Sequence, residues 1–219
     1  QQDFKLLGTA YLDVKPFEGF KYRFLVGMDI GIGTNDQYTP RFFSGDFTNQ
    51  PFALITQSRG TFVSPLISNQ FSYQKTINKH NFDLLAVIEQ QTFRSTSLQG
   101  SGQNNLTNEV RVLQGVQNQV TTGNQIDYAL ISYIGRINYD YDKKYLFSAS
   151  IRQDGGSRFG PRNKWGTFPS VSVGWRLSEE SFMKSLTAIS DLKLRASYGQ
   201  TGNDRIGDYA YQATINSNH

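Results

Sequence analysis

The chain has 219 residues, with 22 Lys and Arg against 18 Asp and Glu, and a net charge of +4. Its mean hydropathy is −0.48, and no run approaches the roughly 18 apolar residues that a membrane helix needs, so a helical membrane protein is excluded. Without cysteine the chain can form neither a disulfide framework nor a thiolate metal site. A membrane β-barrel is compatible with this hydropathy, because only alternate residues of its strands face lipid.

The chain begins with two predicted strands, residues 4–14 and 20–30, joined by a short reversal at 16–19. Apolar side chains occupy every second position in each, and charged side chains fall between them, which is typical of a strand with unlike faces. Residues 31–64 follow, rich in Gly, Asn, Thr and Pro and without clear periodicity. A segment of this length predicts a functional or mobile loop.

Two further strands are predicted over 69–77 and 81–94, on either side of a turn at 78–80. The phase of the second is ambiguous, because five apolar residues run consecutively over 84–88. Residues 95–125 are dominated by Gln, Asn, Ser, Thr and Gly, and are predicted to be a second long loop that could include a short helix near 108–113.

The alternating pattern is clearest in the second half of the chain. It predicts strands over 128–141, 145–152, 169–177 and 192–198. A short polar turn joins the first two, and the glycine-rich segment 154–167 follows as an irregular loop. Ser178 is predicted to cap a helix of about two turns, with Glu179 and Glu180 in its first turn, where the helix dipole favours anions.

Two features of these strands decide between architectures. In the six clearly phased strands no Lys, Arg, Asp or Glu falls in the apolar register, and a cationic side chain near the midplane of a bilayer costs roughly 2 to 4 kcal/mol. The connections alternate between short and long, as do those of outer-membrane barrels. The alternative is a soluble or surface-exposed β-sandwich that serves as an adhesin or lectin. Strands of 11 to 14 residues argue against it, because sandwich strands usually end near 5 or 6.

The second half also resembles a known family. SYIGRINYDY, DGGSRFG, KWGTFPSVSVGWRLSEE and LKLRASYGQTGN followed by IGDYAY occur in that order within residues 132–211. This run closely resembles the barrel of SusC/RagA-type TonB-dependent outer-membrane transporters of Bacteroidetes, and the earlier hairpins are similar more loosely.

The resemblance implies an all-β, antiparallel transmembrane barrel of about 22 strands, closed by a plug. Residues 1–219 would be a partial barrel domain of about eight strands, a fragment without the plug, the TonB box or the remaining strands. The implied function is import of glycan or peptide fragments across the outer membrane. The implied partners are a SusD-like lipoprotein, the TonB complex and outer-membrane lipid.

Catalysis is not expected. The two histidines are His80, in a predicted turn, and the terminal His219, so no His-based triad or metal cluster can be assembled. The carboxylate pairs Asp140 with Asp142 and Glu179 with Glu180 fit turn chemistry and capping better than catalysis. DGGSRFG lacks nucleotide-binding spacing, so no cofactor is expected. Lys and Arg do not cluster with aromatics, which excludes nucleic acid as an expected partner.

Candidate ligand contacts lie in the first long loop, where aromatic side chains alternate with hydrogen-bonding groups, a combination that suits sugars, peptides or a lid protein. These residues are Tyr38, Arg41, Phe42, Phe43 and Asp46. Packing of the loop on itself is the competing explanation. Five cations of the polar registers are expected to face the lumen, where they could pair with plug carboxylates or attract anionic cargo: Arg136, Arg152, Arg176, Lys193 and Arg195. Trp165 is expected to anchor the strand near the upper membrane boundary.

Overall fold

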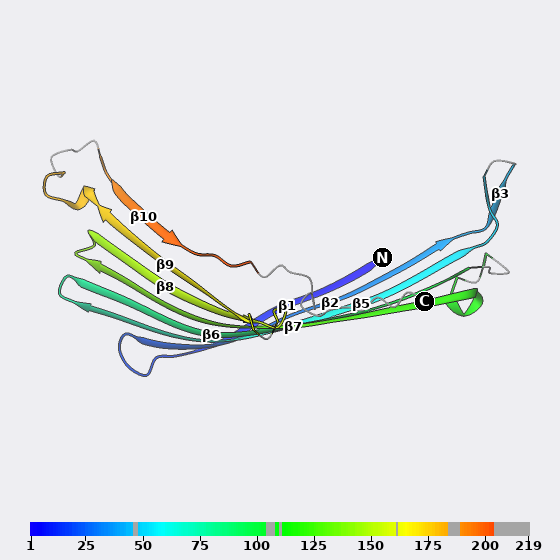
Figure 1. Ribbon diagram of the computed structural model, residues 1–219, viewed down its shortest axis with the longest axis horizontal. Coiled ribbons are helices and arrows are strands. Elements are labelled where there is room, and N and C mark those ends of the chain that lie inside the picture. Colours follow the sequence, from blue (N-terminus) through cyan, green and yellow to red (C-terminus); the bar gives the residue numbers. More distant parts are fainter. Residues whose placement is uncertain (46–47, 104–107, 110, 161, 184–188, 204–219) are drawn as a thin grey trace. The chain divides into compact units, whose positions relative to one another are not determined.

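The protein is described by a computed structural model over residues 1–45, 48–103, 108–109, 111–160, 162–183 and 189–203 (Figure 1). It is an all-β chain whose main sheet has eight strands in the order β1-β2-β5-β6-β7-β8-β9-β10. The strands are β1 (Gln2–Val14), β2 (Phe20–Thr39), β5 (Leu54–Ile77), β6 (His80–Gln103), β7 (Gln117–Tyr141), β8 (Tyr145–Gly156), β9 (Trp165–Arg176) and β10 (Lys193–Gly199). The predicted antiparallel eight-stranded sheet is confirmed.

The described residues contain little other regular structure. A two-stranded hairpin consists of β3 (Phe42–Ser44) and β4 (Thr48–Gln50), and there are two single-turn 3₁₀ helices, η1 (Leu113–Gly115) and η2 (Leu177–Glu179). No helix in this part of the chain is long and apolar enough to cross a membrane.

The chain divides into two compact units. Unit 1 comprises residues 1–8, 27–65 and 92–127, and unit 2 comprises residues 9–26, 66–91 and 128–219.

Unit 2 contains tight turns whose backbone conformation suits hairpins. Asp142 and Lys143, between β7 and β8, both have positive φ, 55° and 57°, and the Lys144 N–H donates to the Tyr141 carbonyl at 3.0 Å. Positive φ at both central residues is the type I′ geometry, which matches the twist of paired strands. Gly19, in the turn between β1 and β2, has a φ of 82°.

Strand register in unit 2 brings the apolar positions of four strands onto one side of the sheet. Tyr139 pairs with Phe147, Phe147 with Val173, and Val173 with Ala196. Because directly opposed residues of an antiparallel pair share a face, the predicted apolar registers of β7–β10 coincide. We call this side the apolar face; it carries Ile131, Tyr133, Ile137, Tyr139, Tyr141, Tyr145, Phe147, Ala149, Ile151, Trp165, Val171, Val173, Trp175, Leu194, Ala196 and Tyr198. The opposite side is the polar face.

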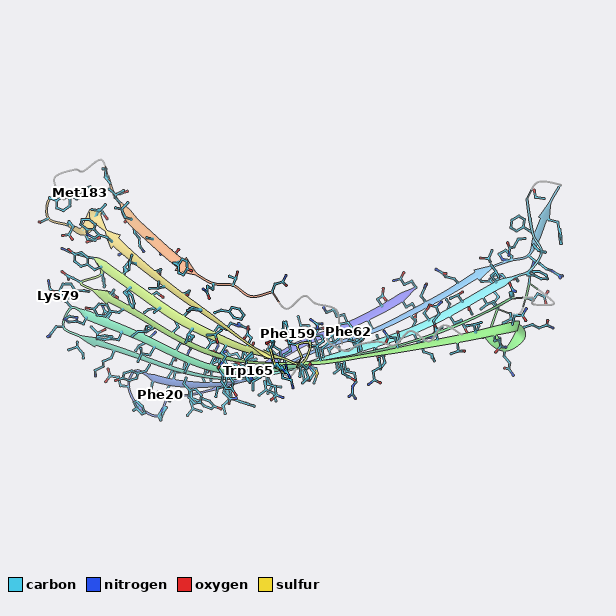
Figure 2. All side chains as sticks on the ribbon, viewed as in Figure 1. Phe20, Phe62, Lys79, Phe159, Trp165 and Met183 are labelled. Atoms are coloured by element: carbon cyan, nitrogen blue, oxygen red, sulfur yellow. The ribbon has the colours of Figure 1, made fainter. Side chains whose placement is uncertain are left out.

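The apolar face is the more exposed of the two, the reverse of a soluble domain. Val173 is 52% exposed and Leu194 is 56% exposed, whereas Ser132, on the polar face, is 1% exposed. Side chains project from both sides of these strands in Figure 2. A sandwich requires a second sheet packed against the apolar side, and the exposure of this face in the structure argues against that alternative.

The exposure of residues 84–88 shows which of their side chains lie on each side of the sheet. Leu84, Ala86 and Ile88 are exposed, while Val87 is buried. The Phe82 ring centroid lies 5.1 Å from that of Tyr139 on the apolar face, and Leu84 and Ala86 follow Phe82 at every second position, so they belong to that side. In residues 84–88, apolar side chains therefore lie on both sides of β6, and for this reason the sequence shows no alternation of apolar and polar residues there.

Both predicted long loops are wrong in extent. β2 continues to Thr39 and β5 begins at Leu54, within the segment predicted as the loop 31–64; β6 continues to Gln103 and β7 begins at Gln117, within 95–125. The extensions of β2, β6 and β7 are mostly polar, and in that of β5 the apolar residues occur in adjacent pairs, so none of them shows a sustained period of two. Backbone pairing nevertheless needs no amphipathic side chains. The alternation of short and long connections is confirmed by these bounds.

The remaining differences are local. β8 extends to Gly156 and β9 begins at Trp165, which leaves a shorter connection than the predicted 154–167. The helix predicted near 108–113 is replaced by η1 at Leu113–Gly115. In place of the helix predicted from Ser178, the described residues form η2 and a turn to Met183. Residues 184–188 of that prediction lie outside the described part of the chain.

Unit 1 has a small core of its own. Ala53, Ile55 and Val116 are 0%, 2% and 6% exposed. Gly100 and Gly102 allow the β6 backbone to approach Leu113 and Val116, because a Cβ at either position would overlap those side chains. This packing holds the connection between β6 and β7 against the strand end.

Candidate functional site

The polar face of unit 2 is a hydrogen-bonded layer. The Arg152 guanidinium donates to Asp154 at 2.8 Å and to the Ser132 hydroxyl at 3.1 Å. The Ser148 hydroxyl donates to Asn138 Oδ1 at 2.6 Å, and Ser150 and Ser170 lie 2.7 Å apart, oxygen to oxygen. Ser132 is 1% exposed, and because a buried polar group is costly unless paired, its hydrogen bond from Arg152 offsets that cost.

The five predicted cations all lie on that polar face by register. Arg136 opposes Ser150, Arg152 opposes Ile134 and Phe168, and Arg195 opposes Gly174. Arg176 and Lys193 oppose one another directly. Arg152 forms an ion pair with Asp154. Three others, Arg176, Lys193 and Arg195, have no carboxylate within ion-pair distance among the described residues. The structure therefore brings three of the five together at the β9–β10 pair.

Neighbouring turns of unit 2 are linked by ion pairs. Lys79 Nζ lies 2.9 Å from Asp142 Oδ2, and the Asp142 N–H donates to the Lys79 carbonyl at 2.7 Å. The hydrogen bond to Asp142 raises the pKa of the Lys79 ammonium above its ordinary value. Sequence reasoning assigned Asp142 to turn chemistry, and the structure confirms that role.

Glu180 joins three further side chains at the same end of the unit. It accepts hydrogen bonds from the Tyr145 hydroxyl at 2.7 Å and from Trp175 Nε1 at 3.1 Å, and its Oε2 lies 3.5 Å from Lys144 Nζ. The hydrogen bond from Tyr145, followed by that from Trp175, holds the pKa of Glu180 below its ordinary value. Glu180 was predicted as a helix cap; its actual role is to fix the aromatic side chains where the strands end.

Aromatic side chains gather at two levels of the apolar face. At the turn level, the ring centroids of Tyr145 and Trp175 are 6.3 Å apart, and those of Tyr141 and Tyr145 are 6.4 Å apart. At the other level, the centroids of Tyr133 and Trp165 are 6.0 Å apart. In Figure 2, Lys79 marks the turn end of the unit and Trp165 the opposite end of these strands. Trp165 is the first residue of β9 rather than part of an irregular loop, and its expected place near the upper membrane boundary stays a prediction.

The residues predicted to contact ligand lie in unit 1, at the end of β2 and in β3. The rings of Phe42 and Phe43 are 44% and 74% exposed, and Arg41 is also exposed. Asp46 lies outside the described residues. Tyr38 is only half-buried, and the Arg111 guanidinium carbon lies 5.0 Å from its ring centroid.

Asn108, which was not predicted from the sequence, forms the hydrogen bonds that hold residues 38–41 in place. Its Oδ1 accepts hydrogen bonds from the Tyr38 hydroxyl at 3.0 Å and the Arg41 N–H at 3.2 Å, and its Nδ2 donates to the Arg41 carbonyl at 3.2 Å. A single amide can satisfy a backbone donor and a backbone acceptor at once. No periodicity marks such a residue, because the contact joins segments some seventy positions apart.

The described residues contain no group of three or more His, Asp or Glu side chains that could hold a metal ion. His80 is a strand residue rather than a turn residue: its Nδ1 lies 2.8 Å from the Tyr139 hydroxyl, and its ring stacks on that of Tyr139. The histidine therefore belongs to the aromatic level near the turns.

Comparison with known proteins gives consistent relatives. The chain is 38% identical over 214 residues to TonB-dependent receptor P39 of Formosa agariphila, a match that covers 94% of this chain and 20% of that protein. It is 39% identical over 145 residues to TonB-dependent receptor SusC of Bacteroides thetaiotaomicron, covering 64% of this chain and 14% of SusC. No family model matches.

Solved structures agree at the level of the fold. A structure of the RagAB peptide transporter superposes with a TM-score of 0.87 over 99% of this chain and 25% of that chain, at 24% identity. A second structure, the RagAB peptide importer in an open state, gives a TM-score of 0.88. The chain thus spans between about a seventh and a quarter of the length of these proteins. They are named as receptors and transporters, in agreement with the expectation that the chain is not an enzyme.

Proposed function

This chain matches part of the SusC/RagA-type TonB-dependent receptors in sequence and in fold, and on that premise we propose that it is a section of an outer-membrane barrel that imports nutrient oligomers. The proposal includes a glycan or peptide cargo, a SusD-like lipoprotein as a lid, and energy from the TonB complex. About 22 strands would close the barrel around a plug.

The main support for this proposal is the spacing of two tryptophans on the apolar face of unit 2. Trp165 and Trp175 are at opposite ends of β9 and share that face, ten positions apart. At about 3.3 Å per residue they are separated by about 33 Å along the strand, or about 25 Å along the membrane normal for a strand tilted by about 40°. That is the height of the apolar band of outer-membrane barrels.

The positions between these tryptophans fit hydrocarbon. Thr167, Pro169, Val171 and Val173 share the face with them on β9, and none is charged. Phe147, Ala149 and Ile151 lie opposite on β8. The Trp175 Nε1–H donates a hydrogen bond to Glu180, as expected for an indole that lies at the boundary between an apolar and an aqueous environment.

The import role places ligand contacts at the end of β2 and in β3. The exposed rings of Phe42 and Phe43 are available for a sugar ring or an apolar peptide side chain, and Arg41 and Tyr38 supply polar groups beside them. Asp46, which lies outside the described residues, is included among the proposed ligand contacts on the basis of the sequence alone. The five cations of the polar face would line the lumen, where anionic cargo or carboxylates of the plug could pair with them.

Uptake in the native host tests this function. A strain that lacks the gene should lose growth on one class of oligosaccharide or peptide supplied as the sole nutrient, and the wild-type gene should restore it. The double substitution Phe42→Ala and Phe43→Ala should reduce uptake while the amount of protein in the outer membrane stays constant. Unimpaired growth of the deletion strain on every nutrient of both classes would contradict import.

A further inference from the structure

An aromatic ring interrupts the polar face of unit 2. Phe168 on β9 opposes Arg152 on β8, so both side chains are on that face. The nearest positions of β9 on the same side are Gly166 and Ser170. A large apolar side chain in a layer of hydroxyls and charges adds nothing to strand pairing, so this ring calls for a separate explanation.

Phe168 lines a cavity of about 810 Å³ within unit 2. Leu130 and Phe159 line it as well, and all three side chains are half-buried. In Figure 2, Phe159 is at the same end of these strands as Trp165. A cavity of this size with an apolar lining and a few polar groups is typical of a small-molecule site.

The polar groups of this cavity include a fixed ion pair. Arg152 Nε donates to both oxygens of Asp154 at 2.8 Å, and the same guanidinium donates to Ser132. A carboxylate has about four lone-pair positions, so Asp154 can accept further hydrogen bonds from a ligand beside Arg152. Asn163 and Gln200 also line the cavity, and a side-chain amide both donates and accepts.

The segment that follows β8 forms one wall of the cavity and is held by hydrogen bonds. The Ser157 N–H donates to the Ala129 carbonyl at 2.9 Å, and the Ala129 N–H donates to the Ser157 hydroxyl at 2.8 Å. The Gly156 N–H donates to the Lys164 carbonyl at 3.0 Å. A ligand therefore meets a wall that is already ordered, which lowers the entropic cost of binding.

Gly166 brings the aromatic ring close to the carboxylate. It opposes Asp154 directly, and a Cβ at this position would lie 2.6 Å from the Phe168 ring. The missing side chain lets the ring lie against the strand next to Asp154. The charge of Arg152 is matched by that of Asp154, and Lys164 is exposed, so the interior of the cavity suits an uncharged ligand.

We propose that this cavity is a subsite for a neutral pyranose ring of a glycan cargo. The negative face of an aromatic ring attracts the C–H groups of a sugar. Each sugar hydroxyl both donates and accepts, which suits a carboxylate that lies beside a guanidinium and amides. Peptide N–H and C=O groups each do only one of these, so a peptide uses the mixed set less completely. The inference rests on the proposed import function and assigns its cargo to the glycans.

Hydrogen exchange of the full-length receptor tests the proposal. The receptor is purified in detergent from the outer membrane of its host and mixed in turn with maltohexaose, cellohexaose, laminarihexaose, xylohexaose and mannohexaose. A tryptic digest of casein is the peptide probe. We expect at least one hexasaccharide to slow exchange of the backbone amides in residues 154–168, and the casein digest to leave them unchanged.

Substitutions in the cavity identify the contacts. The dissociation constant comes from the concentration dependence of that protection, and Phe168→Leu, which removes the ring but keeps an apolar side chain, should raise it about tenfold. Phe168→Tyr retains the ring and should keep the wild-type value. Asp154→Asn should also weaken binding about tenfold, because it removes a charged acceptor.

Two matched controls lie outside the cavity. Phe147→Leu makes the same change on the apolar face of β8, and Asp140→Asn makes the same change at the far end of β7. Neither should alter the dissociation constant. An equal loss of affinity in these controls would show that the effect is not local and would overturn the subsite.

Three further results would overturn the proposal. They are the absence of protection by every hexasaccharide, protection by the casein digest alone, and an unchanged dissociation constant in both Phe168→Leu and Asp154→Asn. Growth of the host on peptides through this protein, without protection by any hexasaccharide, would refute the glycan subsite and leave the import function standing. The two proposals therefore fail separately.

Discussion

The Tyr145 hydroxyl donates a 2.7 Å hydrogen bond to Glu180, which also accepts from the Trp175 indole of the neighbouring strand. One carboxylate from the segment after β9 thereby fixes two aromatic side chains that oppose each other across β8 and β9. The contact couples the turn region to the aromatic level that we place at one membrane boundary.

Stability should depend on pH through Glu180. Its pKa is lowered in the folded protein from an ordinary value of 4.5, so its stabilising contribution is present above that value and is lost as the pH falls through the lower folded pKa. The melting temperature of the wild type should exceed that of Glu180→Gln at neutral pH, and the difference should shrink on acidification below 4.5. Thermal unfolding in detergent at several pH values measures it.

Glu179→Gln is the matched control for this measurement. Glu179 precedes Glu180 in the chain, is exposed and makes no ion pair with the described residues. Its substitution should give the same small change at every pH. A constant difference between the wild type and Glu180→Gln across the whole range would contradict the role given to Glu180.

The two faces of β9 should respond oppositely to a charge. Val171→Arg places a cation between Trp165 and Trp175 on the apolar face, at a cost of about 2 to 4 kcal/mol if that face meets hydrocarbon. Ser172→Arg, one position along, places the same charge on the polar face. The amount of folded protein in the outer-membrane fraction should fall sharply for the first variant and little for the second. Equal losses would argue against lipid contact.

The sequence predicted the paired strands of unit 2 well because the two sides of each strand there have different surroundings. Tyr139, Phe147 and Val173 were assigned to one side from period alone, and the register confirms the assignment. In unit 1 residues 33–39 of β2 are almost entirely polar, so the extension of this strand to Thr39 left no trace in the pattern. Single long-range contacts such as Tyr38 with Asn108 are likewise invisible, because no local rule connects the two positions.

A close contact between Gly155 and Trp165 should be intolerant of substitution. A Cβ at Gly155 would lie 2.7 Å from the Trp165 ring, so Gly155→Ala should displace the indole, lower stability by about 1 to 3 kcal/mol and change the tryptophan emission. Gly135→Ala is the control on the same face, where the added Cβ would meet Ile151 at an ordinary 3.6 Å. Fluorescence and thermal unfolding of both variants in detergent distinguish them, and similar behaviour of the pair would refute the contact.

Removal of the Asn108 amide should release the segment that carries Arg41, Phe42 and Phe43. Asn108→Ala deletes the three hydrogen bonds to Tyr38 and to the Arg41 backbone, each worth about 0.5 to 1.5 kcal/mol. Faster hydrogen exchange at the Arg41 amide and faster tryptic cleavage after Arg41 are therefore expected. Asn108→Asp keeps the acceptor for Tyr38 and the Arg41 N–H but loses the donor to the Arg41 carbonyl, so its exchange should be intermediate. If the alanine variant exchanged at the wild-type rate, Asn108 would not be what holds this segment in place.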